Sequence, residues 1–378
     1  MFKSILDQSF SSNKLMNGIF QFLLLIIFVG CSGTSKIQWQ ATTFHKPKEN
    51  PILQADSTLT FFCPINKRMV QWQKADVFNP AAVIKNNQVY LVYRCEDNPK
   101  ASLGSRISRL GLAYSEDGIY FSKYNKPVLY PDNDEFKIYD YPGGCEDPRI
   151  VETEEGKYII TYTSWNQKVA RLSIAVSEDL VHWKKTGPAF KKAYNGKLLD
   201  TWSKSGSIIT KMKKNKQIAT KFNGKYWMYW GEHGINLAWS ENLTDWYPNL
   251  DEKGNLKLIV KPRDHMFDSD LTECGPPAII TKKGILLLYN GKNATSEKAS
   301  PELPKGTYSV GQILFDLNNM ERVIERSDKY LIKPTLPHEI SGQYKAGTVF
   351  SEGMVFFKSK WHIYYGTADS FVGVVIKD

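Results

Sequence analysis

Short runs of apolar residues that alternate with polar ones dominate the chain beyond its N-terminal region. The runs are rich in β-branched and aromatic residues and are bounded by Gly, Pro, Asn, Asp or Ser, which is typical of β-strands. No long segment has an apolar period of 3.6 residues, so we expect few helices. The pattern predicts an all-β protein.

One kind of repeat is a strand followed by a tight turn. Ala113, Ala175 and Ala238 recur at near-equal spacing, each in a run that ends in Ser-Glu-Asp or Ser-Glu-Asn and is followed by an aromatic residue. Ser, Asp and Asn side chains bond their own backbone in such turns, and the aromatic ring can pack back on the sheet. We interpret these turns as structural.

A second repeat alternates with the first and occurs five times. Each unit has a short apolar segment opening with Pro, Gly or Ala, and then a strand of β-branched and aromatic residues. The units cover residues 79–94, 147–163, 205–231, 275–291 and 346–366. Five sheets of about four strands each, closed into a ring that protects their edges, make a five-bladed β-propeller. The alternative is a pair of β-sandwiches, but the chain shows no composition break between two domains.

In such a propeller the innermost strand of every blade delivers its first residues to a central funnel. The residues expected to converge there are Asn79, Asp147, Arg149, Ser205, Glu273 and the segment around Gly347, with Arg94, Glu232 and Asp369 at the ends of the neighbouring strands. Hydroxyl groups take charge-assisted hydrogen bonds, and sugar faces stack on aromatic rings. The funnel therefore suits a sugar.

The N-terminus has the features of a lipoprotein leader. Residues 19–29 form an apolar run that is too short for a confident membrane span but suits a signal-peptide core. The run ends before Gly30-Cys31, which resembles a bacterial lipobox. We predict a signal peptide over residues 1–30, a lipidated Cys31 with a tether or N-terminal extension over 31–66, and a catalytic propeller over 67–378. The protein would be exported and anchored to a membrane of the bacterial cell envelope through its lipid.

Charge and cysteine content exclude some other classes. The net charge is +10, but the basic residues are scattered, and the densest cluster, at 211–216, reads as a hairpin tip between apolar strands. We predict no nucleic-acid partner. Four cysteines besides Cys31 permit disulfides, although buried free thiols fit equally well. There is no Cys-x-x-Cys pair, and we predict neither a metal nor a cofactor.

The segment 143–149 reads Gly-Gly-Cys-Glu-Asp-Pro-Arg. Its glycines allow a tight turn and a close approach to a ligand, Glu146 and Asp147 supply carboxylates, and Pro148 fixes φ before Arg149. We interpret it as an active-site corner. The alternative is an ordinary turn in which Glu146 and Arg149 pair at the surface.

This segment resembles a motif of glycoside hydrolase family 130. The resemblance extends to Tyr-Trp-Gly-Glu at 229–232, Glu-Cys-Gly-Pro-Pro-Ala at 273–278, Tyr-Asn-Gly at 289–291 and Tyr-Gly-Thr-Ala-Asp-Ser at 365–370, and so covers the chain from about residue 72 to 375. It implies a five-bladed propeller that acts on β-linked mannosides with inversion, by phosphorolysis or by hydrolysis. It also implies that Asp147 contacts the sugar at the bond that is cut, and that Asn79, Arg94 and Asp369 hold the mannose there.

Two departures from the family's phosphorylase pattern favour hydrolysis. Asn290 stands where the phosphorylases commonly have histidine, and Glu273 with Cys274 stands where they have small residues. A phosphorylase needs cations for phosphate, whereas an inverting hydrolase needs a second carboxylate to activate water. We predict that Glu232 and Glu273 form the acid/base pair, as in the exported β-1,2-mannosidase members that the chain most resembles, without assigning the two roles.

The prediction is an inverting, exo-acting β-mannosidase that cleaves β-1,2-linked mannosides in an oligosaccharide or glycan. One alternative is a phosphorylase that releases mannose 1-phosphate, and another is a surface propeller that binds glycans without chemistry. Further predicted substrate-binding residues are Arg149, Lys204, Asn290 and Tyr141, the last as part of an aromatic wall. The loop 263–268 could hold the leaving sugar or a phosphate. The oligomeric state is not predicted.

Overall fold

The computed structural model describes residues 44–102 and 104–377. The predicted signal peptide and Cys31 lie outside these residues. The described residues all belong to one compact unit. Within the described ranges, no helix is long and apolar enough to cross a membrane.

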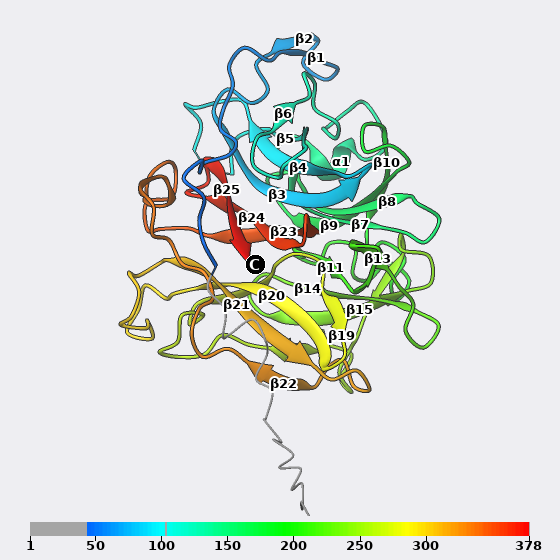
Figure 1. Ribbon diagram of the computed structural model, residues 1–378. Coiled ribbons are helices and arrows are strands. Elements are labelled where there is room, and N and C mark those ends of the chain that lie inside the picture. Colours follow the sequence, from blue (N-terminus) through cyan, green and yellow to red (C-terminus); the bar gives the residue numbers. More distant parts are fainter. Residues whose placement is uncertain (1–43, 103, 378) are drawn as a thin grey trace, which may run out of the picture. The chain divides into compact units, whose positions relative to one another are not determined.

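The all-β prediction is confirmed. Apart from a short α-helix, α1 (Lys137–Asp140), and a short 3-10 helix, η1 (Pro337–Ile340), the regular elements of the described residues are strands. The hairpin β1 (Phe61–Cys63) and β2 (Arg68–Val70) precedes five antiparallel groups, which follow one another from cyan to red in Figure 1.

The groups are built as follows. The first has β3 (Asp76–Lys85), β4 (Gln88–Glu96), β5 (Ser108–Ser115) and β6 (Ser122–Lys123), and the second has β7 (Gly144–Glu152), β8 (Tyr158–Trp165), β9 (Ala170–Ser177) and β10 (Trp183–Pro188). The third has β11 (Ser207–Ile208), β14 (Tyr226–Trp230), β15 (Ile235–Ser240), β16 (Trp246–Pro248) and β17 (Leu258–Val260). The fourth has β18 (Leu271–Cys274), β19 (Ile279–Thr281), β20 (Gly284–Lys292), β21 (Tyr308–Phe315) and β22 (Val323–Arg326), and the fifth has β23 (Phe350–Phe357), β24 (Lys360–Thr367) and β25 (Phe371–Lys377).

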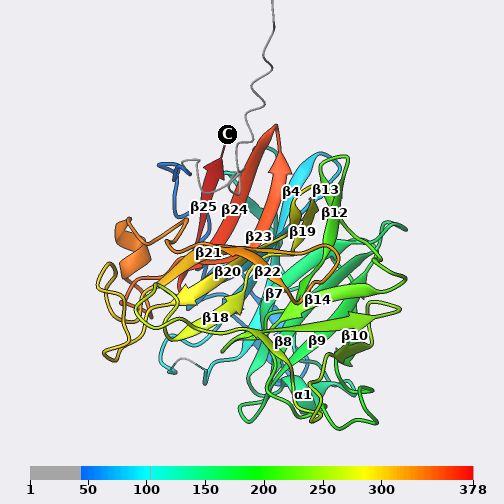
Figure 2. The same ribbon diagram turned by 90° about the horizontal axis from the view of Figure 1, so that it is seen from below.

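Neighbouring groups are joined by short parallel pairings between strands. β5 meets β7, and the hairpin of β12 (Thr210–Lys213) and β13 (Lys216–Ala219) bridges β7 to β19. The last group also lies against the first, because β23 and β24 pack on β3. Figure 2 shows β23 and β24 next to the first group, of which β4 is labelled. The basic cluster at 211–216 is therefore a hairpin, as interpreted from the sequence.

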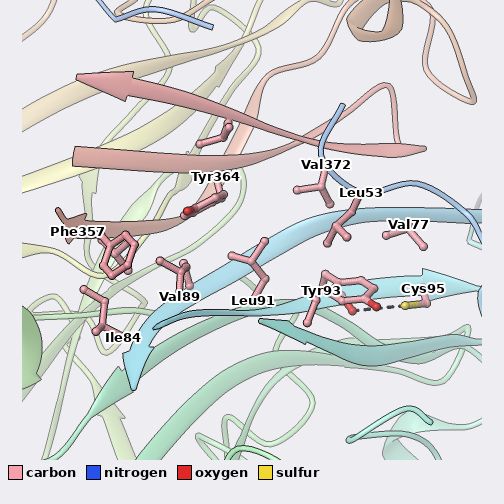
Figure 3. Close-up of a cluster of buried hydrophobic side chains, with 14 of the residues drawn as sticks. Leu53, Val77, Ile84, Val89, Leu91, Tyr93, Cys95, Phe357, Tyr364 and Val372 are labelled. Carbon is pink, nitrogen blue, oxygen red and sulfur yellow. Dashed lines mark hydrogen bonds between the residues drawn. The ribbon is translucent and has the colours of Figure 1, made fainter. Parts of the chain in front are cut away.

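Burial separates inner from outer strands. β7 is buried along its whole length and β3 along all but its last residue, whereas β10 and β22 are largely exposed or half-buried. A strand covered on both faces must carry apolar side chains on both, which explains the nearly continuous apolar runs. Figure 3 shows one core layer, in which Leu91 and Tyr93 of β4 lie near Tyr364 and Val372 of the last group.

Residues 44–66 belong largely to this folded unit. His45 pairs with Ile376 and Leu53 with Val372, and Leu53 and Phe61 are buried. The hairpin β1–β2 also spans the boundary that we predicted at 66/67. The predicted N-terminal extension thus packs on the strands in its described part, through bridges to β25 that the sequence pattern does not indicate.

Two smaller expectations concern the turns and the cysteines. Ser115 Oγ accepts the backbone N–H groups of Asp117 and Gly118, and Asp117 accepts those of Ile119 and Tyr120. The same bonds recur in the next group, so these turns are structural as interpreted. The cysteines at 63, 95, 145 and 274 are all free and buried, which is the second of the two arrangements considered.

Candidate active site

Three inner strands are irregular near their beginnings. The pairing shifts between Phe78 and Pro80 in β3, between Glu146 and Arg149 in β7, and between Ser351 and Gly353 in β23. At the first two shifts, Asn79 and Asp147 have positive φ angles of 49° and 48°. A bulge of this kind bends the strand and re-aims one side chain. Asn79 Nδ2 donates to Asp147 Oδ1 at 2.7 Å, so the two bulges meet.

A cavity of about 270 Å³ lies at this end of the sheets. Its charged lining consists of five carboxylates, Glu146, Asp147, Glu232, Glu273 and Asp369, and two cations, Arg94 and Lys204. Its aromatic lining consists of Phe78, Trp165, Trp202, Tyr308, Tyr344 and Phe350. The structure therefore brings together most of the predicted site residues, Asn79 included, from all five groups of strands.

Arg94 is the centre of the first ionic cluster. Its guanidinium donates to Asp147 at 3.1 Å, to Glu146 at 2.9 Å and to Glu96 at 2.8 Å. Burial acts to raise the pKa of Asp147, but Arg94 and Lys204 outweigh it and hold that pKa well below its usual range. For Glu146 burial prevails over Arg94 and raises the pKa to about 7. Adjacent carboxylates thus differ in charge state near neutral pH.

Lys204 is the centre of the second cluster. Its Nζ lies 3.5 Å from Asp147 Oδ2 and 3.6 Å from Glu232 Oε1. Burial acts to lower the pKa of this ammonium, but the surrounding carboxylates, Glu232 and Asp147 first, raise it well above its ordinary value. Lys204 therefore remains a cation between the carboxylates of three strand groups. Lys204, which we predicted as a substrate-binding residue, thus lies in the cavity wall.

Glu232 and Glu273 have unlike surroundings. Glu273 is buried and accepts a hydrogen bond from Ser205 Oγ, and burial raises its pKa to about 7 against the opposing effect of Lys204. Glu232 accepts a 2.7 Å bond from Trp202 Nε1. Burial also acts to raise the pKa of Glu232, but Lys204 and Trp202 together bring it below its ordinary value. One carboxyl group tends to keep its proton and the other to lose it.

Asp369 completes the lining from the turn between β24 and β25. It has a φ of 49°, as does Ala368 before it. Burial raises its pKa to about 6, while Arg94 acts to lower it. Its carboxyl group is therefore available as a donor or an acceptor, depending on pH.

Arg149 does not line the cavity, although we predicted it as a substrate-binding residue. Its guanidinium donates to the carbonyl oxygens of Cys274 at 2.8 Å and Asp147 at 3.0 Å, and it lies 3.0 Å from Glu352 Oε1. Both Arg149 and Glu352 are buried. Beyond the bulge, the Arg149 side chain takes a different direction from that of Asp147. Its hydrogen bonds link the strands that carry Asp147 and Glu273.

Asn290 and Tyr141 are also placed elsewhere. Asn290 is buried, donates to the carbonyl of Ser351 at 3.1 Å and accepts from its backbone N–H at 2.8 Å, which joins β20 to β23. The ring of Tyr141 lies 5.6 Å from the Lys137 ammonium and is not part of the cavity wall. A hydrogen-bonding side chain at a strand end is as suited to backbone contacts as to a ligand, and the sequence does not distinguish them.

The loop 263–268 is likewise absent from the cavity wall. Arg263 pairs with Asp268 at 3.0 Å, and Asp268 accepts a further bond from Tyr289 at 2.5 Å. These three side chains are therefore hydrogen-bonded to one another within the fourth group of strands.

Several residues of the cavity wall were not predicted from the sequence. Trp202 lies in the segment before β11, which has no strand periodicity, and Tyr308 and Tyr344 resemble ordinary core aromatics in the sequence. Their positions depend on how distant groups pack. No three His, Cys, Asp or Glu side chains of the described ranges are grouped as metal ligands.

Comparisons with known proteins assign the family. The model of glycoside hydrolase family 130, described as beta-1,4-mannooligosaccharide phosphorylase, matches residues 45–378. A 1,2-beta-oligomannan phosphorylase from Thermoanaerobacter sp. (strain X514) is 32% identical over 311 residues, covering 81% of this chain and 91% of that protein.

Solved structures agree with this assignment. A putative glycosidase from Bacteroides thetaiotaomicron VPI-5482 is 51% identical, with a TM-score of 0.88 over 90% of this chain and 97% of that one. A second structure, 48% identical with a TM-score of 0.88 over 90% of this chain and 95% of that one, is described with the statement that the GH130 family of mannoside phosphorylases contains glycoside hydrolases that target beta-1,2 mannosidic linkages in Candida mannan. The family that the sequence motifs implied is thereby confirmed: the chain belongs to glycoside hydrolase family 130.

Proposed function

We propose that the protein is an inverting, exo-acting β-mannosidase that hydrolyses β-1,2-linked mannosides. The observation that carries the proposal is the pair Glu232 and Glu273, which line one cavity in unlike electrostatic environments. Two carboxyl groups whose pKa values are pushed apart are the requirement for a general acid and a general base.

Glu273 is the general acid in this proposal, and Glu232 is the general base. Glu232 takes a proton from a water molecule whose oxygen attacks the anomeric carbon. Glu273 gives its proton to the glycosidic oxygen as the carbon–oxygen bond breaks. The water enters opposite the leaving group, so a β-mannoside yields α-mannose.

The remaining charged residues would hold the terminal mannose. Asp147 is kept ionised by Arg94 and Lys204 and accepts from Asn79, which makes it a strong, fixed acceptor for a sugar hydroxyl. Asp369 and Arg94 would bind further hydroxyls, and Trp202 or Tyr308 would offer an aromatic face.

Cleavage at the chain end is proposed from the architecture around the cavity. We infer that the five groups form a five-bladed propeller whose inner strands surround the site, in keeping with the packing of the last group on the first. A cavity of about 270 Å³ is at the small end of ligand pockets, and so favours a terminal sugar over a chain interior.

Water is favoured over phosphate as the acceptor by the charge of the cavity. Within the described residues, five carboxylates face two cations there, and both cations are already engaged with carboxylates. A phosphate dianion needs cations that are free to bind it. The identity of about 50% to chains described as glycosidases points the same way.

Phosphorolysis is the second candidate. It is supported by the description of the family model and by the names of curated relatives about 30% identical to this chain. It predicts that phosphate is required for any product to form.

The deciding experiment is NMR analysis of β-1,2-mannobiose incubated with the protein, with and without inorganic phosphate. We expect α-mannose to appear first and at a rate independent of phosphate. Mannose 1-phosphate formed only with phosphate would establish the phosphorylase instead. Binding of the disaccharide without any product would leave only a glycan-binding role.

Export and lipidation at Cys31 remain part of the proposal. Metabolic labelling with a fatty acid in a bacterial host tests them: the full-length chain should be labelled and Cys31→Ser should not. Label on the Ser variant, or on neither, would refute an anchor at this residue.

A further inference from the structure

A second and larger hollow lies next to the catalytic cavity. Its volume is about 870 Å³, and its walls come from the β1–β2 hairpin, the segments 97–100 and 105–107, Pro142 and Gln167. Gly104 lines the catalytic cavity while Ser105 lines the hollow. The two spaces thus share the loop that joins β4 to β5 as a common wall.

The strand pairing places both spaces at the same end of the sheets. Glu96 at the end of β4 pairs with Ser108 at the start of β5, and Ser108 also pairs with Gly144 at the start of β7. Gly144 in turn pairs with Trp165 at the end of β8. The loops that leave these positions carry the walls of the hollow, so it lies at the same end of the sheets as the catalytic cavity.

The charges of the hollow are not balanced. Arg106 pairs with Glu96 at 3.0 Å and also with Asp76, and Asp97 pairs with Arg109 at 2.8 Å. The other charged residues of the wall are all basic and all exposed: Arg68, Lys74 and Lys100. Among the residues described by the structure, none of these three side chains makes an ion pair.

We propose that this hollow receives the part of the glycan beyond the cleaved bond, and that it favours a glycan bearing a phosphate ester there. The inference rests on the proposed function. If a terminal mannose fills the small cavity, the rest of the glycan must extend out of it, and the hollow is adjacent to it across Gly104 and Ser105. Three unpaired cations attract an oxyanion, and the side-chain amides of Asn66, Asn98 and Gln167 offer partners for sugar hydroxyls.

The contribution of such exposed cations is modest. Each solvent-exposed pair adds little, so three together give a preference of about tenfold for the phosphorylated over the neutral glycan at low salt. Added salt screens exposed charges, so the preference shrinks as ionic strength rises. A neutral glycan gains nothing from the three cations.

The test compares two substrates of the full-length protein: β-1,2-mannotriose and the same trisaccharide with a 6-phosphate on its reducing-end mannose. Wild type should show a kcat/KM about tenfold higher for the phosphorylated form. The triple variant Arg68→Gln, Lys74→Gln, Lys100→Gln should lose this preference while its kcat/KM for the neutral form stays unchanged. Lys282→Gln, an exposed lysine in a distant turn, is the matched control.

Equal kcat/KM for the two substrates in wild type, or a preference that survives in the triple variant, would overturn the proposal. Vesicles of phosphatidylcholine with phosphatidylserine form a further arm. Retention of wild type on these vesicles, lost in the triple variant, together with no preference between the trisaccharides, would make the patch a membrane surface instead.

Failure of the proposed function is distinguishable from failure of this inference. If neither trisaccharide is cleaved by wild type, the mannosidase proposal fails. Calorimetry with mannose 6-phosphate then tests whether the hollow binds a phosphate ester, independently of any cleavage. Binding by wild type that weakens about tenfold in the triple variant supports the oxyanion site, and absence of binding refutes it.

Discussion

The loop between β4 and β5 separates the catalytic cavity from the outer hollow. The two spaces differ in whether their basic side chains are paired with carboxylates. In the cavity, Arg94 and Lys204 are surrounded by carboxylates. At the hollow, Arg68, Lys74 and Lys100 face solvent without an acidic partner among the described residues. Desolvation makes an isolated buried charge costly, whereas water tolerates one at the surface. The cations of the cavity therefore set the protonation states of the neighbouring carboxyl groups. The three cations of the hollow stay available to a ligand.

The largest effect is expected from removing a carboxylate of the interior. Glu273→Gln should lower kcat at least 10³-fold, a loss on the order of that for a positioned acid. In wild type the rate should fall as pH rises through about 7, because a raised pKa keeps Glu273 protonated below that value. The measurement is a pH profile with β-1,2-mannobiose.

A matched control for this variant is Glu241→Gln, in an exposed repeat turn, which should keep full activity. An aryl β-mannoside with a good leaving group separates the roles, since it needs no acid. Glu273→Gln should recover much of its kcat on this substrate and Glu232→Gln should not. The opposite pattern would exchange the acid and base assignments.

The next effect is on stability and concerns the buried pair of Arg149 and Glu352. Arg149→Met leaves the Glu352 carboxyl group without its cation and the carbonyls of Asp147 and Cys274 without their donor. Burial raises the pKa of Glu352 well above its ordinary value, so the cost comes mainly from the two buried carbonyl oxygens that lose their donor. We expect a loss of about 2–4 kcal/mol in the free energy of unfolding, measured by urea denaturation. Arg322→Met removes an exposed arginine that pairs with Asp316, and should cost less than about 1 kcal/mol. Similar losses in the two variants would contradict the contrast between interior and surface.

A smaller effect is expected from Trp202→Phe. The indole N–H lowers the pKa of Glu232, so its removal should raise that pKa and move the acidic limb of the pH–rate profile to higher pH. The rate at the optimum should fall by about tenfold or less, in line with one charged hydrogen bond. Trp227→Phe, whose indole bonds only the carbonyl of Phe222 in the third group, serves as control. An unshifted acidic limb would remove Glu232 from the role of base.

The smallest effect on stability is expected in the wall of the hollow. Lys100→Gln should leave the free energy of unfolding within about 0.5 kcal/mol of wild type, since an exposed cation without an ionic partner contributes little to the fold. Thermal melts at low and high salt would check this. A clear destabilisation would show that the cations of the hollow are structural and not available to a ligand.

The sequence predicted the strands and most residues of the cavity, but not the direction of every side chain. Strand alternation and the five repeated units predicted the sheets, and the motif positions Asn79, Asp147, Glu232 and Glu273 do line one cavity. Arg149 was misplaced because the register after a bulge decides which face a side chain takes, and a bulge is not visible in the alternation of residues.

The last strand group illustrates the same limit. We expected its first strand to begin at residue 346, but β23 begins at Phe350 and puts its irregularity at Glu352. Trp202 lies outside any periodic segment and was not predicted, because its approach to Glu232 follows from tertiary packing. Lys204 was predicted as a substrate-binding residue, but its contacts with Asp147 and Glu232 were not.

The bulges at Asn79 and Asp147 separate chemistry from packing. A side chain on a regular strand shares its orientation with neighbours that build the core, so changing it disturbs both. At a bulge, the re-aimed residue is released from that alternation, while the residues on either side continue to fill the interior. The same scaffold can therefore present an amide in one sheet and a carboxylate in the next. The positive φ angles at both positions restrict the choice mainly to Asn, Asp and Gly, so the exchange that this scaffold tolerates best is between an amide and a carboxylate.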